Sequence, residues 1–532
     1  MLARILGSTA MVAGLAVAAP VGADTTLHLL HINDLHSRIQ PINRFDSTCG
    51  AEDDAAGECF GGVARVATAI NTLRGELEAA GENVLVLDAG DQFQGSLMYT
   101  TYKGEVEAEF MEAIGFDVMA VGNHEFDDGP ENLARFVEMV SFPVISGNLD
   151  LSQSNVLSDE MVPDHVILDV NGIQVGIISA LATDTAETSS PGPSIIFQNE
   201  IDALQADVDA LTEAGVNIII ALTHVGLPQD IRIAEAVTGI DVIVGGHSHT
   251  YLSSSDPDRA GAYPTMITNP DGAFVPIVQA YAYSKYLGHL EVTFDDDGNV
   301  VYASGDTMVL DASVTPDADI AARVSELSGP IEEAMAEVIG ESTDVIEGSR
   351  EVCRAMECAM GNLVADAMLE RVREQGIDVA IQNGGGLRAT IDSGEVTMGE
   401  VFTVLPFQNT LATFQLTGAG IVEALENGVS QVADGAGRFP QVSGMSYTFD
   451  LSQEPGSRIS NVMIGDAPID LEAVYGVVSN NYMRGGGDGY SSFTTAENAY
   501  DFGPGLEEVV ATYLGENSPY TPYTDGRITQ AE

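Results

Sequence analysis

Gly122-Asn123-His124-Glu125-Phe126-Asp127 is the stretch that decides the fold, because it places amide, imidazole and carboxylate groups in one turn. It follows the apolar run 118–121, Val-Met-Ala-Val, which is typical of a buried strand. Loops that leave buried strands are where proteins build their sites. The surrounding sequence must therefore decide whether this string is an isolated turn or part of a larger centre.

Four other strings repeat this arrangement: Ile32-Asn33-Asp34-Leu35-His36, Asp88-Ala89-Gly90-Asp91, Thr223-His224 and Gly245-Gly246-His247-Ser248-His249. Each follows an apolar run, and together the five strings hold five of the nine histidines in the chain. Carboxylates, an amide and imidazoles that converge at strand ends favour a centre for two metal ions. A hydrogen-bonded turn histidine explains any one string, but the repetition favours the metal centre.

Length and composition indicate two folded domains, since the chain has 532 residues of which 45% are hydrophobic. Residues 1–4 form a basic start, residues 5–19 are apolar, and residues 21–23 are small. This pattern predicts a signal peptide, residues 1–23, that is cleaved after Ala23. No later segment has the length and apolarity of a membrane span, so we expect a secreted protein, periplasmic or extracellular.

The four cysteines fit an oxidising compartment. Cys49 and Cys59 are close in sequence, as are Cys353 and Cys358, so two local disulfides are the economical pairing. The two crossed pairings remain open, as does a structural zinc site built from all four cysteines.

Charge is the most unusual bulk property, because 80 acidic and 20 basic residues give a formal net charge of −60. Such a charge argues against nucleic-acid polymers and anionic membranes as partners, and it favours a solvation shell suited to saline surroundings. An anionic substrate would need metal ions and a few placed arginines to overcome the repulsive field.

The order of elements predicts a layered α/β domain, residues 24–315, because strand-like runs alternate with helical stretches such as 62–80 and 201–214. Near its end, Leu290, Val292 and Phe294 alternate with polar residues before the turn 295–299, which predicts a β-hairpin. Residues 316–340 look like an amphipathic linker helix with a break at Gly329-Pro330. Residues 341–532 are expected to form a second, α+β domain.

The ordered strings NDLH, DAGDQ, GNHEFD, TH and GGHSH resemble the calcineurin-like metallophosphoesterase domain. The second half carries GNLVADA at 361–367, QNGGGLR at 382–388 and GGGDG at 485–489. These strings are similar to the C-terminal domain of the secreted 5′-nucleotidase family, which includes bacterial UDP-sugar hydrolases and animal ecto-5′-nucleotidase. The resemblance covers nearly all of the mature chain, and it implies a four-layer α/β/β/α sandwich followed by a C-terminal substrate-binding domain.

The resemblance implies two divalent metal ions, zinc or manganese, and it assigns their ligands. It places Asp34, His36, Asp91 and His249 on the first metal, and Asp91, Asn123, His224 and His247 on the second, with Asp91 bridging. His249 departs from the Gln or Asn of several members, and Ser37 stands where a Gly is often found.

His124 matches the catalytic histidine of the family, which stabilises the transition state or protonates the leaving oxygen, while Asp127 would orient its ring. The residues alone leave simpler readings open: Asp91 as a helix N-cap, and Asp127 with Asp128 as a helix-start pair.

The resemblance also implies a substrate site in the second domain. Arg354 and Arg388 match arginines of the phosphate and ribose region, and Asn123 is expected to contact substrate as well as a metal. The remaining matches are two aromatic residues that sandwich the nucleobase, an amide that contacts it, and a carboxylate that binds the ribose hydroxyls: Phe407 and Tyr482, Asn383, and Asp488. Tyr482 stands where the family more often has Phe.

The implied function is hydrolysis of nucleoside 5′-monophosphates to nucleoside and phosphate, with UDP-sugars or nucleoside di- and triphosphates as further substrates. Alternative enzymes are a 2′,3′-cyclic-nucleotide phosphodiesterase/3′-nucleotidase and a thiosulfate-processing relative, and an alternative of another class is a non-catalytic nucleotide-binding or surface interaction protein. The metal ligands precede residue 250 and the proposed nucleoside contacts follow residue 353, so catalysis is expected to need both domains, with a hinge in 316–340. The oligomeric state is not predicted.

Overall fold

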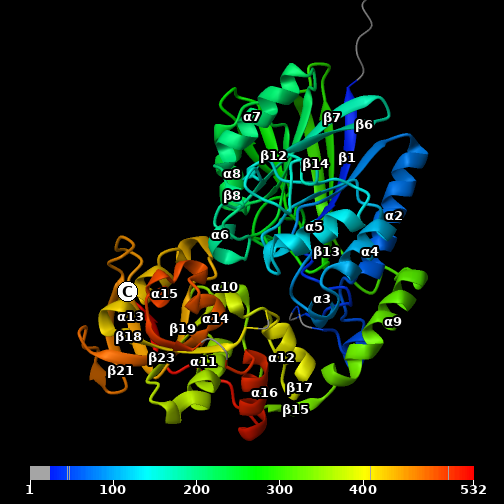
Figure 1. The fold of residues 1–532 in the computed structure, drawn as a ribbon. Helices are drawn as coiled ribbons and strands as arrows, with labels where there is room; N and C mark the ends of the chain where they lie inside the picture. The colour runs from blue at the N-terminus through cyan, green and yellow to red at the C-terminus, as the bar shows by residue number, and fades with distance from the viewer. Residues whose placement is uncertain (1–23, 45, 47, 408, 501–502, 532) are drawn as a thin grey trace, which may run out of the picture.

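The computed structural model describes residues 24–531 except 45, 47, 408 and 501–502, so the predicted signal peptide lies outside the described residues. Figure 1 shows two lobes: an N-terminal one, blue to green, and a C-terminal one, yellow to red, with helix α9 (Ala318–Met335) running between them. Within the described part of the chain, no helix combines the length and apolarity needed to cross a membrane.

Two six-stranded sheets form the centre of the N-terminal lobe. The first has the order β14 (Val300–Val309), β13 (Tyr286–Phe294), β1 (Thr25–Ile32), β2 (Asn83–Asp88), β3 (Val118–Ala120), β4 (Val144–Ile145). The second has the order β11 (Thr265–Thr268), β12 (Phe274–Val278), β10 (Val242–Gly245), β9 (Ile218–His224), β7 (Ile173–Leu181), β6 (His165–Val170). Fully buried aliphatic side chains from both sheets, such as Leu29 and Leu222, pack into one core between them.

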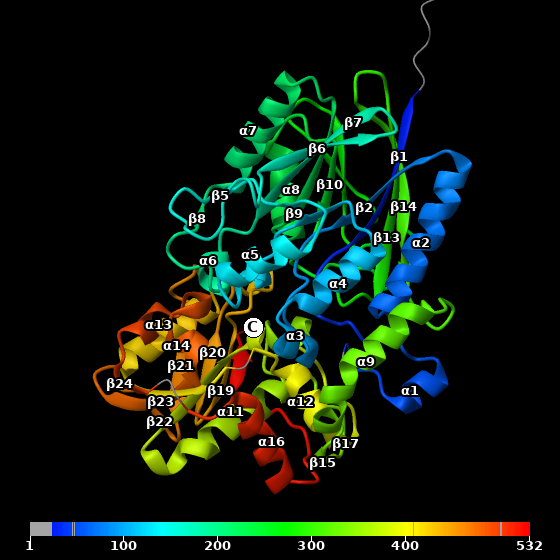
Figure 2. The ribbon, with the colours of Figure 1, turned by 45° about the vertical axis from the view of Figure 1, so that its right-hand side comes forward.

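Helices cover the outer face of each sheet. A second core joins the first sheet to α2 (Val63–Ala80), α4 (Glu105–Ile114), α5 (Pro130–Met139) and α9. A third joins the second sheet to α7 (Glu200–Glu213) and α8 (Leu227–Ala236). The lobe is therefore an α/β/β/α sandwich, as the resemblance implied, and Figure 2 shows its layers after a turn of the view.

The local predictions for this lobe are confirmed. The expected helices correspond to α2 and α7. The expected hairpin is the antiparallel pair β13–β14, in which Leu290, Val292 and Phe294 are buried. Disulfides join Cys49 to Cys59 and Cys353 to Cys358, which confirms the local pairing and leaves no cysteine for a zinc site.

The break expected at Gly329-Pro330 is wrong, because α9 continues through Pro330 to Met335 and β15 (Val338–Ser342) begins soon after it. Proline removes one helical N–H group, but packing holds the helix on both sides of it. Leu327 is buried in the second core and Ile331 packs on the same core, while the Tyr102 hydroxyl donates a hydrogen bond of 2.8 Å to the Leu327 carbonyl.

The C-terminal lobe is α+β, as expected. Its main sheet has the order β19 (Pro440–Ser443), β16 (Val379–Asn383), β23 (Val474–Asn480), β18 (Leu411–Thr417), β24 (Glu497–Tyr500). A smaller sheet has the order β22 (Ala467–Pro468), β21 (Ile459–Ile464), β20 (Met445–Phe449), β25 (Ile528–Gln530), and β15 pairs with β17 (Gly394–Thr397). Its longer helices are α11 (Ala359–Val372), α12 (Met398–Val404), α13 (Gly418–Gly428) and α16 (Leu506–Glu516), and its short ones are α10 (Arg350–Cys353), α14 (Asn481–Arg484) and α15 (Ser491–Thr494).

Candidate metal centre and active site

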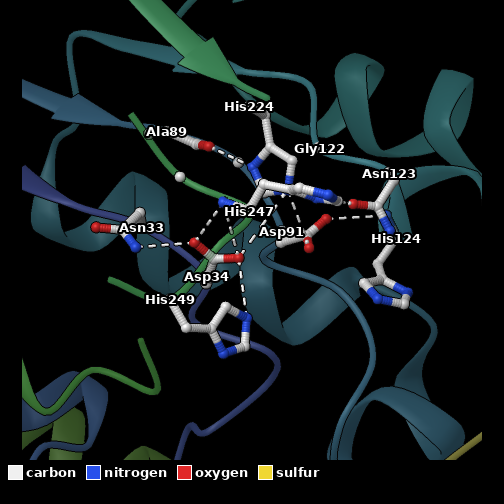
Figure 3. Close-up of polar contacts among 12 residues, drawn as sticks. Asn33, Asp34, Ala89, Asp91, Gly122, Asn123, His124, His224, His247 and His249 are labelled. Carbon is white, nitrogen blue, oxygen red and sulfur yellow. Dashed lines mark hydrogen bonds and ion pairs between the residues drawn. The ribbon is translucent and has the colours of Figure 1, made fainter. Parts of the chain in front are cut away.

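The five polar strings come together at one edge of the two sheets. In the first sheet β1, β2 and β3 are parallel neighbours, and in the second β9 and β10 are parallel neighbours. Their carboxyl ends therefore meet. His224 is the last residue of β9, and the loops that follow the other four strands carry His124 and the remaining six predicted metal ligands. Figure 3 shows most of these side chains pointing toward a common centre.

Two clusters of ligand atoms lie at this centre. In the first, His249 Nε2 is 3.1 Å from Asp34 Oδ1 and 3.0 Å from His36 Nε2. In the second, His224 Nε2 is 3.1 Å from Asp91 Oδ2. Asp91 Oδ2 also lies 3.7 Å from His36 Nε2, so Asp91 stands between the two clusters.

The remaining predicted ligands complete the second cluster. His247 joins Asp91 and His224 in a group whose ligand atoms lie within 4.8 Å of one another. The Nδ1 atom of His247 is 2.9 Å from the Asn123 side-chain oxygen. His224 donates through Nδ1 to the Ala89 carbonyl at 2.6 Å, which turns its Nε2 toward Asp91.

These residues fit divalent metal ions. His224 Nε2 is fully buried and has no hydrogen-bond partner among the described residues, although it faces a carboxylate. Atoms His36 Nε2 and His249 Nε2 point at each other inside the protein, an arrangement that a shared cation explains. Imidazole, carboxylate and amide ligands together suit divalent metal ions.

The loops reach this arrangement through unusual backbone geometry. Five of the seven predicted ligands have positive φ: Asp34, His36, Asp91, His247 and His249. Such conformations cost free energy for residues other than glycine and are concentrated at functional sites. Gly122 allows two loops to pack closely, because a Cβ at this position would lie 2.3 Å from the Asp91 main-chain nitrogen.

His124 lies beside the clusters and is paired with Asp127. Its Nδ1 is 2.7 Å from Asp127 Oδ2, and its main-chain N–H donates to Asp91 Oδ1 at 2.8 Å. Burial alone would lower the pKa of His124, but the carboxylates of Asp127 and Asp91 raise it above its ordinary value. Its Nε2 is therefore suited to donate a proton or hydrogen bond into the adjoining cavity.

Two residues that the sequence did not single out hold Asp127. Gln94 donates to its Oδ2 at 3.1 Å, and the Ser189 hydroxyl donates to its Oδ1 at 2.7 Å. Asp127 does not start a helix with Asp128, since α5 begins at Pro130 and Asp128 pairs with Lys103. Asp91 is likewise no helix N-cap, because the next helix, α3 (Leu97–Tyr102), is capped by Ser96.

Glu125 is the other residue that the sequence left without a role. Its fully buried carboxylate accepts hydrogen bonds from four main-chain N–H groups. The donors and distances are Asp91 at 3.0 Å, Gln92 at 2.9 Å, Phe93 at 3.1 Å and Gly122 at 2.7 Å. Its position inside the GNHEFD string is the one sequence feature that could have drawn attention to Glu125. Three of its four donors, however, lie on a loop more than thirty residues away in the sequence.

The C-terminal lobe closes over this centre. Arg388 Nη2 lies 3.1 Å from His36 Nε2, and Arg388 Nη1 lies 3.4 Å from His124 Nε2. The Phe407 ring stacks on His124 with a centroid distance of 5.7 Å, and Arg388 lies over the same phenyl ring at 5.3 Å. These contacts join residues far apart in sequence across the boundary between the lobes.

A cavity of about 590 Å³ extends from the centre into the C-terminal lobe, and its lining includes all the predicted substrate residues. Asn383 donates to Asp488 Oδ2 at 2.6 Å. The Tyr482 hydroxyl donates to Asp488 Oδ1 at 3.2 Å, so this hydroxyl is engaged by Asp488. Arg354 and Arg388 are also buried in this lining, and the Cys353–Cys358 disulfide closes the short loop that contains Arg354.

The fold and the site together define a class, that of metal-dependent phosphoesterases with an added substrate-binding domain. Residues 27–251 match the family model for calcineurin-like phosphoesterases, and residues 338–495 match the model for the 5′-nucleotidase C-terminal domain. The chain belongs to the 5′-nucleotidase family.

Its relatives cover nearly the whole chain. A 5′-nucleotidase of Homo sapiens is 36% identical over 96% of this chain and 92% of its own length. A snake venom 5′-nucleotidase of Gloydius brevicauda is 36% identical over 98% of this chain and 91% of its own length. The crystal structure of a 5′-nucleotidase precursor from Thermus thermophilus is 40% identical, covers 95% of this chain and 99% of its own, and superposes with a TM-score of 0.90.

Proposed function

We propose that the protein hydrolyses nucleoside 5′-monophosphates to nucleoside and orthophosphate. The observation that carries this proposal is a single cavity that joins the histidine–carboxylate clusters to the Asn383–Asp488 pair and the rings of Phe407 and Tyr482. Metal ligands suit a phosphoryl group, and a carboxylate and two aromatic rings in the same cavity suit a nucleoside.

We assign Asp34, His36, Asp91 and His249 to one divalent ion and Asp91, Asn123, His224 and His247 to a second, with zinc or manganese as the native metals. When bound, the ions supply Lewis-acid polarisation of the phosphoryl oxygens and activation of the attacking water. Asp91 is the bridging ligand in this assignment because it lies within reach of both clusters.

His124 stabilises the leaving ribose oxygen from Nε2, while Asp127 holds its Nδ1 proton and fixes the ring. Arg354 and Arg388 neutralise the phosphoryl oxygens, and the guanidinium fork of Arg388 is already placed between His36 and His124. These cations also offset the repulsion that a net charge of −60 exerts on an anionic substrate.

Phe407 and Tyr482 stack on the base, Asn383 contacts it, and Asp488 accepts hydrogen bonds from the ribose hydroxyls. The Tyr482 hydroxyl then orients Asp488 instead of reading the base, since it already donates to that carboxylate. Burial raises the pKa of the Asp488 carboxyl, and the hydrogen bond from Asn383 opposes this shift.

UDP-sugars and nucleoside di- or triphosphates are proposed as further substrates. A solved structure of lower identity, 26%, carries the name NAD nucleotidase and comes from Haemophilus influenzae. The two disulfides and the family support a secreted or extracellular protein, and we propose export by the signal peptide with cleavage after Ala23.

Phosphate release from AMP, with and without a chelator, tests the function. We expect release by the native protein, loss after chelation, and recovery when zinc or manganese is restored. The same assay with 3′-AMP and 2′,3′-cyclic AMP separates the alternative enzymes, and hydrolysis of these in place of AMP would favour a cyclic phosphodiesterase/3′-nucleotidase. No release from any of them under any metal would refute the enzymatic function.

A further inference from the structure

Arg354 lies in a short loop whose ends are joined by a disulfide. The loop runs from Cys353, the last residue of α10, to Cys358, which caps α11. The guanidinium of Arg354 has weak local contacts: its Nη1 donates to the Gly435 carbonyl at a long 3.4 Å, and its Nε has no hydrogen-bond partner among the described residues. The position of this guanidinium therefore depends on the main chain of the loop that carries it.

Gln441, in strand β19, holds this main chain with its side-chain amide. The side chain is fully buried, and its Nε2 donates to the Cys353 carbonyl at 2.9 Å and to the Met356 carbonyl at 2.8 Å. Its Oε1 accepts a hydrogen bond from the Cys358 main-chain N–H at 3.3 Å. This amide group thus holds both ends of the loop and a residue between them, whereas the disulfide joins only the ends.

Two glycines allow neighbouring segments to pack closely around this arrangement. A Cβ at Gly361, in the first turn of α11, would lie 2.3 Å from Gln441 Oε1. A Cβ at Gly384, in η3 (Gly384–Gly386), would lie 2.3 Å from the Cys353 carbonyl oxygen. Neither glycine has positive φ, so close approach is what requires them. A larger residue at either position would displace Gln441 or the loop, because protein interiors are close-packed.

We propose that Gln441 is a positioning residue that holds Arg354 in place for the phosphate group of the nucleotide. The proposal rests on the proposed function, since that function gives Arg354 its contact with phosphate. Gln441 does not line the nucleoside cavity, so it acts through the loop and touches no substrate. A loop that is ordered before binding loses little further conformational entropy when the nucleotide binds, and the open donors of the guanidinium then meet the phosphate oxygens.

Gln441→Met tests this role, because methionine has nearly the same length and none of the amide donors or acceptors. Calorimetry on the metal-loaded protein should compare two ligands: adenosine, and a non-hydrolysable 5′-phosphonate analogue of AMP. We expect the Kd for the phosphonate to rise roughly tenfold, because charge-assisted hydrogen bonds from Arg354 are lost, and the Kd for adenosine to stay unchanged. A general loss of structure would weaken both ligands alike.

Gly361→Ala perturbs the same hydrogen bonds from another element and leaves Gln441 itself intact. Alanine is favoured over glycine in a helix, but its Cβ would push against Gln441 Oε1. We expect the same selective loss of phosphonate affinity, and this variant decides the question if Gln441→Met fails to fold. Ser443→Ala is the matched control on the same strand, since it removes a buried hydrogen bond to Asp366 at 2.6 Å and should bind both ligands like the native protein.

A double-mutant cycle shows whether Gln441 acts through Arg354. Arg354→Ala removes the guanidinium, so adding Gln441→Met should cause little further loss of phosphonate affinity. A second loss of the same size in the double variant would mean that Gln441 acts independently of Arg354, and it would overturn the proposal.

Equal weakening of adenosine and phosphonate in Gln441→Met and Gly361→Ala would also overturn the proposal, and so would native affinity for the phosphonate in both. These outcomes leave AMP hydrolysis by the native protein, and hence the proposed function, untouched. Conversely, a native protein that releases no phosphate from AMP, but binds the phosphonate in a manner that depends on Gln441 and Arg354, would refute the proposed function and support the positioning role.

Discussion

Arg388 Nη2 lies 3.1 Å from His36 Nε2, although the two residues are separated by 352 positions and belong to different lobes. The phosphoryl group must enter between this guanidinium and the metal ligands. The contact therefore places a cation of the C-terminal lobe directly beside the cluster of predicted metal ligands in the N-terminal lobe.

Replacing Arg388 should impair catalysis without affecting the metals. For Arg388→Ala we expect kcat/KM for AMP to fall by roughly 10²-fold, because a charged, two-pronged contact to the phosphoryl oxygens is lost. Arg388→Lys should recover part of the loss, since it keeps the charge but not the fork. Metal content, measured by mass spectrometry of the purified protein, should match the native value in both. An unchanged kcat/KM in Arg388→Ala would place the phosphoryl group elsewhere.

Asp127→Asn tests the pairing with His124. We expect kcat to fall by about 10²- to 10⁴-fold, the range of general acid–base catalysis, with little change in metal content. Ser189→Ala, which removes the 2.7 Å hydrogen bond to Asp127, should lower kcat by a smaller factor and shift its pH profile. Asp128→Asn makes the same charge change one residue along, where the carboxylate pairs with Lys103, and should keep nearly native kcat. Equal losses in Asp127→Asn and Asp128→Asn would argue against the pairing.

The layered α/β class of the N-terminal domain was predictable because runs of strand-forming residues, helical spacing of apolar residues and turn residues are local signals, whereas the four-layer sandwich was implied only by the resemblance to a known family. The sequence also placed polar residues at or just after the ends of successive strands, and the structure brings these residues together at one edge of the sheets: Asp34, His36, Asp91, His124, His224, His247 and His249. The role of Glu125 was not predictable, because its four donors lie on loops that only tertiary packing brings together. The hydrogen bond of Ser189 to Asp127 depends likewise on how loops pack, which no local pattern encodes.

Glu125→Gln should loosen the loop that carries the bridging ligand Asp91. An amide oxygen can replace only part of the carboxylate, and its NH₂ group would face main-chain donors, leaving buried N–H groups unsatisfied at about 1–3 kcal/mol each. We expect a lower thermal midpoint and less bound metal per chain. Glu131→Gln, on the exposed start of α5, is the matched control and should resemble the native protein. Native metal content in Glu125→Gln would show that the loop holds its shape without this carboxylate.

The buried carboxyl group of Glu107 should make the stability of the protein depend on pH. Its side chain is fully buried in α4, and burial raises its pKa to about 7 although the Ser37 hydroxyl opposes the shift. Between the ordinary pKa of 4.5 and about 7 the folded state keeps a proton that the unfolded state has lost, so stability declines as pH rises through this window. In Glu107→Gln this decline disappears. The thermal midpoint of the variant relative to native protein should therefore be higher at pH 8 than at pH 5, measured by circular dichroism, and a constant difference would mean that Glu107 has no raised pKa.

The net charge of −60 predicts that salt stabilises the folded protein. Self-repulsion among 80 acidic residues favours expansion of the chain, and salt weakens it as the screening length falls from about 30 Å at 0.01 M to about 3 Å at 1 M. We expect the thermal midpoint to rise steeply at low sodium chloride concentration and then to level off. Sucrose at matched osmolality does not screen charge and should lack the steep initial rise. Bound metals also stabilise the folded state. The same series with chelator present therefore isolates the contribution of repulsion among the acidic residues to the thermal midpoint. A midpoint independent of salt in both series would mean that the acidic residues are spread widely enough for their repulsion to contribute little to stability.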